Sequence, residues 1–291
     1  MISSEILKKI KTLEIKTRKV VNSTFSGEYH SVFKGRGISF SEVREYYLGD
    51  DVRLLDWNVT AKMGSPYVKL FEEERELTVM LMVDLSGSGE FGTVEKTKLQ
   101  IAAEIAGILG FSATKNRDRV GLVLFSDKVE RYIPPKKGKT HIFWILRDIF
   151  YYQAQSKKTS LTVALDYLLN ICKKKAIVFL ISDFLDAGYE KKIKIAAKKH
   201  DLVPIFLEDP KEAQLPASGI LCMEDTETGE IQYVDMRDSA LRKAFHHQMA
   251  LRKQSLNGFF KSIGIHPIQI HCDKPYFEPL AAYFQARAKR Y

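Results

Sequence analysis

Cysteine and long apolar runs are scarce in this sequence, and each scarcity excludes a class of protein. Three cysteines occur in 291 residues, at positions 172, 222 and 272, and no two form the close pair of a zinc site. This pattern predicts reduced thiols in a cytoplasmic protein. The longest apolar runs, such as residues 77–83, are far shorter than the ~20 residues of a membrane-spanning helix. The first residues lack the pattern of a secretory signal.

Several catalytic signatures are also absent. There is no G-x-x-x-x-G-K-[ST] phosphate loop and no H-E-x-x-H zinc motif. No nucleophile with a base, and no pair of catalytic carboxylates, gathers at one predicted site. The sequence therefore favours a binding protein over an enzyme. The enzymatic alternative is a metal-dependent phosphohydrolase of haloacid-dehalogenase type. Enzymes of that type carry a D-x-D motif whose second Asp is the general acid. In this sequence Ser86 occupies that second position.

The chain carries an excess of positive charge, with 45 Lys and Arg against 36 Asp and Glu, a formal charge of +9. Such an excess raises the alternative of a basic protein that binds nucleic acid or a membrane surface. The basic residues are nevertheless scattered, and clusters such as 173–175 and 191–194 have the spacing of solvated helix faces and turns. Nucleic acid is therefore disfavoured as a partner.

From residue 77 onward, short apolar segments alternate with longer amphipathic ones. This alternation predicts an α/β fold with a doubly wound, mostly parallel sheet covered by helices. The segment 77–83 is apolar on both faces, as a central strand requires. Further strands are predicted at 119–125, 128–133, 176–182, 202–207 and 265–271, and helices at 96–115, 141–153, 159–173, 190–200, 239–262 and 275–290.

Two regions fall outside this alternation. Around residues 210–237, a Thr-Gly-Glu turn at 228–230 joins two apolar segments, which predicts a β-hairpin insertion. Residues 1–76 combine a basic amphipathic helix, about 5–21, with short β-segments. We expect them to form a small helix-plus-β subdomain that packs on the α/β domain of residues 77–291, with Trp57 buried at the contact.

Oxygen-bearing side chains follow the predicted central strand directly. Asp84, Ser86 and Ser88 offer a carboxylate and two hydroxyls at the carboxyl edge of the sheet, where open α/β sheets bind ligands. Thr159 begins a predicted helix, and Asp183 follows the strand 176–182, so both reach the same edge. Mg²⁺ prefers hard oxygen ligands and takes few carboxylates. The pattern predicts a divalent-cation site.

The order and spacing of these residues resemble the metal-ion-dependent adhesion site of von Willebrand factor A domains. The resemblance fills all five ligand positions and implies a Rossmann-like fold with bound Mg²⁺ or Mn²⁺. An open sixth position would then accept an Asp or Glu carboxylate of a partner. The five ligands so implied are Asp84, Ser86, Ser88, Thr159 and Asp183.

Motifs along nearly the whole chain resemble the bacterial DUF58 family, a family of unknown function. They include residues 27–31 (Gly-Glu-Tyr-His-Ser), 35–40 (Gly-Arg-Gly-Ile-Ser-Phe), 42–46 (Glu-Val-Arg-Glu-Tyr), 49–53 (Gly-Asp-Asp-Val-Arg), 134–138 (Pro-Pro-Lys-Lys-Gly) and 200–203 (His-Asp-Leu-Val). The resemblance implies a MoxR-type AAA+ ATPase as a partner, and von Willebrand A membrane proteins as further ones. It suggests a role in the assembly or maturation of client proteins.

A second surface is a candidate for partner contact if the partner does not bind at the predicted metal site. Its residues are Arg44, Asp50, Asp51 and Arg53. The structural interpretation of the same segment is a turn in which Asp50 and Asp51 pair with Arg53.

Overall fold

The computed structural model describes residues 39–72, 76–90, 96–213, 217, 219–224 and 230–289. Its centre is a six-stranded sheet with the order β10-β7-β6-β3-β4-β5. Neighbouring strands run parallel except β4 and β5, which pair antiparallel. The strands are β3 (Thr78–Asp84), β4 (Arg119–Phe125), β5 (Val129–Lys136), β6 (Ile177–Ser182), β7 (Asp201–Glu208) and β10 (Ile268–His271). The predicted α/β fold with a mostly parallel sheet is confirmed.

Helices cover both faces of the sheet, and β3 shows why. Successive side chains of a strand point to opposite faces, so Leu81 and Val83 join one buried cluster while Met80 and Met82 join the other. The first cluster packs under α5, α6 and α11 and the second under α7 and α8. These helices are α5 (Lys98–Lys115), α6 (Lys139–Tyr151), α7 (Leu161–Ile171), α8 (Glu190–Lys199) and α11 (Phe277–Ala288).

The edge strand β5 is longer than its sequence predicts. We expected it to end before Pro134 and Pro135, but it continues to Lys136. Proline lacks an N–H donor, and an edge strand needs donors on one side only. Gly121 of β4 lies under this end of β5: a Cβ there would be 2.7 Å from the Met80 sulfur and 3.0 Å from the carbonyl oxygen of Ile133.

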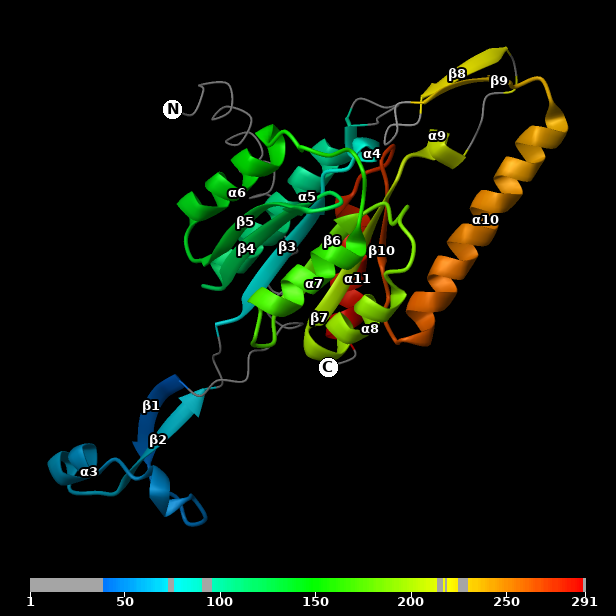
Figure 1. Ribbon diagram of the computed structural model, residues 1–291. Helices are drawn as coiled ribbons and strands as arrows, with labels where there is room; N and C mark the ends of the chain where they lie inside the picture. Colours follow the sequence, from blue (N-terminus) through cyan, green and yellow to red (C-terminus); the bar gives the residue numbers. More distant parts are fainter. Residues whose placement is uncertain are drawn as a thin grey trace.

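An arm of three elements follows β7 (Figure 1). The short helix α9 (Pro210–Ala213) precedes the antiparallel pair β8 (Ile220–Glu224) and β9 (Ile231–Asp235), in the region of the predicted hairpin insertion. Helix α10 (Ser239–Ser262) then returns the chain to the sheet, and Asp238 caps its start.

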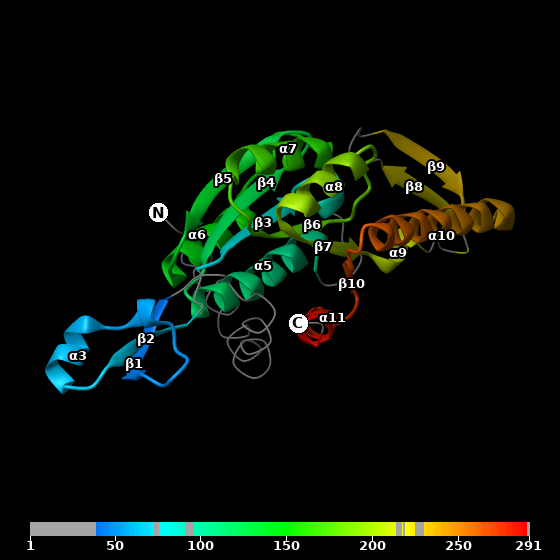
Figure 2. The ribbon, with the colours of Figure 1, turned by 90° about the horizontal axis from the view of Figure 1, so that it is seen from below.

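The amino-terminal part of the described chain forms a separate two-stranded sheet. Strands β1 (Ser39–Glu45) and β2 (Tyr67–Glu72) pair antiparallel, and between them lie η2 (Val52–Leu54) and α3 (Trp57–Met63). Figures 1 and 2 show this unit set apart from the six-stranded sheet. The expectation that Trp57 packs on the α/β domain is wrong, because its side chain is 70% exposed.

Two further predictions concern this end of the chain. The helix predicted at residues 5–21 lies outside the described residues. The division of the chain near residue 76 stays a prediction. Within the described part of the chain, no helix combines the length and apolar character needed to span a membrane.

Candidate metal centre

Asp84 ends the central strand β3 and lies buried at the carboxyl edge of the sheet. Both of its carboxylate oxygens are hydrogen-bonded. Oδ1 accepts from the backbone N–H of Ser86 at 2.9 Å, and Oδ2 accepts from the hydroxyl of Ser182 at 2.7 Å. The Ser86 hydroxyl, also buried, is hydrogen-bonded to the same carboxylate. The orientation of Asp84 is therefore fixed by its own loop and by the neighbouring strand β6.

The charge of Asp84 is unfavourable in this environment. Burial, and after it the negative charge of Asp183, raise the pKa of its carboxyl to about 7, against the lowering effect of the serine hydrogen bonds. Burial and a like charge are two of the causes that favour a neutral carboxyl. A bound cation would remove the repulsion between the two carboxylates.

The loop that carries Ser86 is joined to the loop that carries Thr159. The N–H of Gly87 donates to the carbonyl of Lys157 at 2.8 Å, two residues before Thr159, which is half-buried. Ser88 lies next to Gly87 in the short helix α4 (Gly87–Glu90). Its side chain lies outside the described residues.

Thr159 lies in the loop before α7, not in the first turn that we expected. The helix begins at Leu161, and Ser160 caps it. The N–H of Ser160 donates to the carbonyl of Ser126 at 2.9 Å, and the N–H of Leu161 donates to Asp186 Oδ2 at 2.7 Å. These bonds join the Thr159 loop to the loops that follow β4 and β6. The loops of Asp84, Thr159 and Asp183 therefore meet at one edge of the sheet.

Asp183 follows β6, and its side chain is 5% exposed. Its Oδ2 lies 2.9 Å from the ammonium nitrogen of Lys98, and its Oδ1 accepts from the N–H of Leu185 at 3.2 Å. The next residue, Phe184, has a φ of 54°, in the left-handed region that a bulky side chain rarely adopts. The carbonyl of Phe184 accepts from Arg252 of α10 at 2.9 Å.

Lys98 and Glu212 were not predicted as members of this site. Lys98 opens α5 and contacts both Asp183 and the carboxylate of Glu212 in α9, the latter at 2.5 Å. Burial opposes the charge of Lys98, but the two carboxylates outweigh it and raise its pKa. The only sequence signal was a basic residue at the start of a mostly apolar helix.

A small pocket lies beside Asp84, Lys98 and Asp183, with a cavity volume of about 10 Å³. This is close to the space of one water-sized sphere. No three His, Cys, Asp or Glu side chains among the described residues gather as metal ligands, so an ion here would also need hydroxyl and water ligands. Mg²⁺ accepts such a donor set. The residues that line the pocket are Asp84, Ser86, Gly89, Lys98, Leu99, Ala102, Ile181, Ser182, Asp183 and Leu207.

The second candidate surface belongs to the β1–β2 unit. Arg44 and Asp50 form a two-pronged ion pair, with both N–O distances at 2.8 Å. Asp51 accepts from the backbone N–H of Arg53 at 2.9 Å and caps η2. The charged turn was expected to close through Arg53. It closes through Arg44 instead, because the guanidinium of Arg44 can take both oxygens of Asp50.

Comparison with family models identifies a family of unknown function, and the relatives found among known proteins are uncharacterized. A family model described as "Protein of unknown function DUF58" matches residues 42–255. Uncharacterized proteins Mb1516 from Mycobacterium bovis and Rv1480 from Mycobacterium tuberculosis are each 27% identical over 96% of this chain and 89% of their own length.

The solved structures that the chain is similar to are more distant in sequence. The conserved hypothetical protein BatB from Bacteroides thetaiotaomicron is 14% identical, with a TM-score of 0.47 over 73% of this chain and 99% of that chain. An aerotolerance-related membrane protein from Bacteroides fragilis is also 14% identical, with a TM-score of 0.48 over 74% of this chain and 100% of that chain.

Proposed function

The chain belongs to the DUF58 family, and we propose that it is a non-enzymatic protein that uses one Mg²⁺ or Mn²⁺ ion to bind a carboxylate of a partner protein. The observation that carries the proposal is the pair of buried carboxylates, Asp84 and Asp183, whose charges oppose each other beside buried serine hydroxyls at the carboxyl edge of the sheet. A divalent cation is the group that best relieves this arrangement.

The proposed ligand set is that of a von Willebrand factor A-type adhesion site. Asp84 and Asp183 would supply the carboxylates, and Ser86, Ser88 and Thr159 the hydroxyls. Hydroxyl ligands leave more of the charge of the ion unneutralised than carboxylates do. When bound, the ion would supply a Lewis-acid position for one external carboxylate. The hydrogen bonds from Ser86 and Ser182 hold the carboxylate of Asp84 at the edge of the sheet.

The proposed partner is a MoxR-type AAA+ ATPase, or a client protein that the two handle together, in the cytoplasm. von Willebrand A membrane proteins are further candidates. A positive formal charge of +9 favours an acidic partner surface. The exposed side chains of Lys157 and Lys158, next to the Thr159 loop, favour it at this edge in particular. Assembly or maturation of other proteins is the role that this partnership suggests.

The test is affinity for a purified MoxR-type AAA+ ATPase of the same organism, measured with Mg²⁺, with Mn²⁺ and with excess chelator. Binding should require the metal. Ca²⁺ should replace it poorly, because Ca²⁺ prefers six to eight oxygens at longer distances. Equal affinity under all conditions would contradict the proposal and direct attention to Arg44, Asp50, Asp51 and Arg53. Release of phosphate from simple phosphomonoesters would favour the phosphohydrolase alternative.

A further inference from the structure

The ammonium group of Lys98 is buried inside the candidate metal centre. Its side chain is 3% exposed, and its nitrogen lies between Asp183 and Glu212. Removing a charged group from water is costly unless it is paired and hydrogen-bonded. Two carboxylates satisfy that condition here. A cation held next to a predicted metal ligand also changes the charge that a metal ion would meet.

The formal charges of the cluster show how large this change is. With all three carboxyls ionised, Asp84, Asp183 and Glu212 carry three negative charges, and Lys98 carries one positive charge. The cluster therefore has two excess negative charges, which one divalent cation would neutralise. Without Lys98 the excess would be three, and the site loaded with metal would keep a negative charge.

We propose that Lys98 is a positioning residue of the metal centre that sets its charge, so that the site with a divalent ion still accepts an external carboxylate. The inference rests on the proposed function. Lys98 weakens the attraction of the site for the ion, because it adds a positive charge and holds Asp183. It strengthens the attraction of the loaded site for an anion. The two effects have opposite signs.

This opposition separates the proposal from a purely structural role. Lys98→Met keeps most of the length of the side chain but removes the charge, so it should bind Mg²⁺ about 10-fold more tightly and acetate about 10-fold more weakly. Glu212→Gln should bind Mg²⁺ more weakly and acetate more tightly, because it removes one negative charge and leaves Lys98. If Lys98 only anchored α9, its replacement in a folded variant would change neither the Mg²⁺ affinity nor the acetate affinity.

The experiment uses the full chain and two small probes. Calorimetric titration measures the affinity for Mg²⁺, and broadening of the acetate methyl resonance by bound Mn²⁺ measures carboxylate binding. Lys98→Arg keeps the charge and should restore wild-type behaviour. Lys96→Met is the matched control, since Lys96 is 40% exposed and pairs with Glu104 outside the pocket. It should leave both affinities unchanged.

Each outcome decides the inference. Opposite shifts in Lys98→Met and Glu212→Gln support it. Equal Mg²⁺ and acetate affinities in folded wild type, Lys98→Met and Glu212→Gln overturn it and leave the proposed function intact. A wild-type protein that binds no divalent ion overturns both. If Lys98→Met fails to fold by circular dichroism, Glu212→Gln alone carries the test, and unchanged affinities in that variant reject the proposal.

Discussion

The hydroxyl of Ser182 donates a 2.7 Å hydrogen bond to Oδ2 of Asp84, a residue that precedes it by 98 positions. The hydroxyl oxygen of Ser182 also accepts a hydrogen bond from the backbone N–H of Phe184 at 3.0 Å. Ser182 therefore joins the end of β3 to the backbone turn that follows Asp183. A shift of either predicted carboxylate ligand would disturb the other through this hydroxyl.

Replacement of Asp84 by Asn should abolish Mg²⁺ binding at millimolar concentration while the domain stays folded. The change removes one of the two carboxylates of the proposed set, and a neutral amide oxygen cannot replace its charge. Titration calorimetry measures the loss. Asp127→Asn is the control, because Asp127 is exposed at the end of the neighbouring strand β4. Wild-type affinity in Asp84→Asn would refute the ligand assignment.

The pKa of Asp84 predicts how stability depends on pH when metal is absent. Its value rises from 3.8 to about 7 on folding, chiefly through burial, so the folded chain holds this proton more tightly than the unfolded chain. The resulting stability is complete below about pH 4 and is lost as the pH rises through 7. Between pH 5 and 8 the loss should be roughly 2–3 kcal/mol. Asp84→Asn should remove it.

Urea unfolding of both proteins in chelator, at several pH values, measures this difference. Because other groups titrate in both chains alike, only the difference between wild type and variant reports on Asp84. Saturating Mg²⁺ should reverse the trend for the wild type, since deprotonated Asp84 is the form that would bind the ion. A difference that does not depend on pH would contradict the assignment.

Phe184 should be the most sensitive position in the loop that holds Asp183. Its ring is 1% exposed and contacts the rings of Tyr189, Phe206 and Phe260. Phe184→Ala should therefore cost about 3–5 kcal/mol of stability and weaken Mg²⁺ binding as the loop loosens. Phe277→Ala, at a 43% exposed ring, is the control and should change stability by less than about 1 kcal/mol. Equal losses of stability in Phe184→Ala and Phe277→Ala would show that this aromatic cluster contributes little to the stability of the fold.

The sequence predicted the elements that depend on local patterns and missed contacts between distant residues. Apolar runs such as 77–83 are visible without knowledge of the fold, and parallel strands necessarily bring their carboxyl ends to one edge. The contact of Lys98 with Glu212 spans 114 positions and follows no spacing rule. Trp57 was expected to pack on the α/β domain because the region before residue 77 is too short to hold a core of its own, but Trp57 is exposed in the β1–β2 unit.

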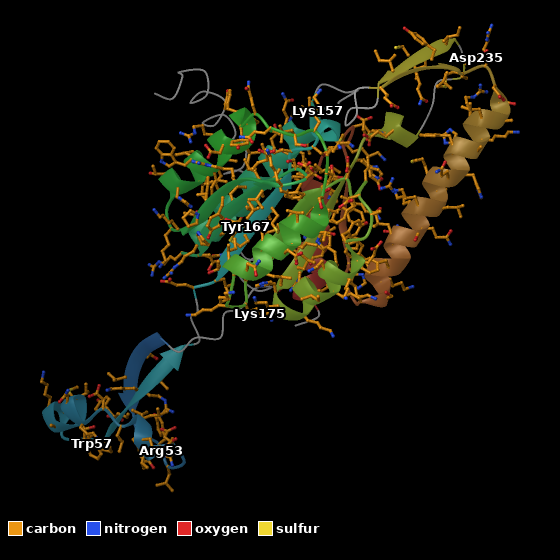
Figure 3. All side chains as sticks on the ribbon, in the orientation of Figure 1. Arg53, Trp57, Lys157, Tyr167, Lys175 and Asp235 are labelled. Carbon is orange, nitrogen blue, oxygen red and sulfur yellow. The ribbon has the colours of Figure 1, made fainter. Side chains whose placement is uncertain are left out.

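We expect an acidic partner to dock at the edge of the sheet where Asp84 and Asp183 lie, next to exposed lysines. Lys157 and Lys175 lie at opposite ends of the α/β layers (Figure 3). The carbonyl of Lys157 accepts a hydrogen bond from the N–H of Gly87, which lies next to the predicted ligands Ser86 and Ser88.

If an acidic partner docks over the metal, the double replacement Lys157→Glu with Lys158→Glu should weaken association about 10-fold at low salt, through like-charge repulsion, and less so as ionic strength rises. Mg²⁺ affinity should not fall, since added negative charge nearby does not repel the cation. The control replaces Lys174 and Lys175 by Glu, which makes the same change in net charge at the far edge. Surface plasmon resonance at two salt concentrations measures the affinity of the two double variants for the partner. Equal weakening by both would show that net charge alone steers the partner, whereas loss confined to the first pair places the contact at the edge where Asp84 and Asp183 lie.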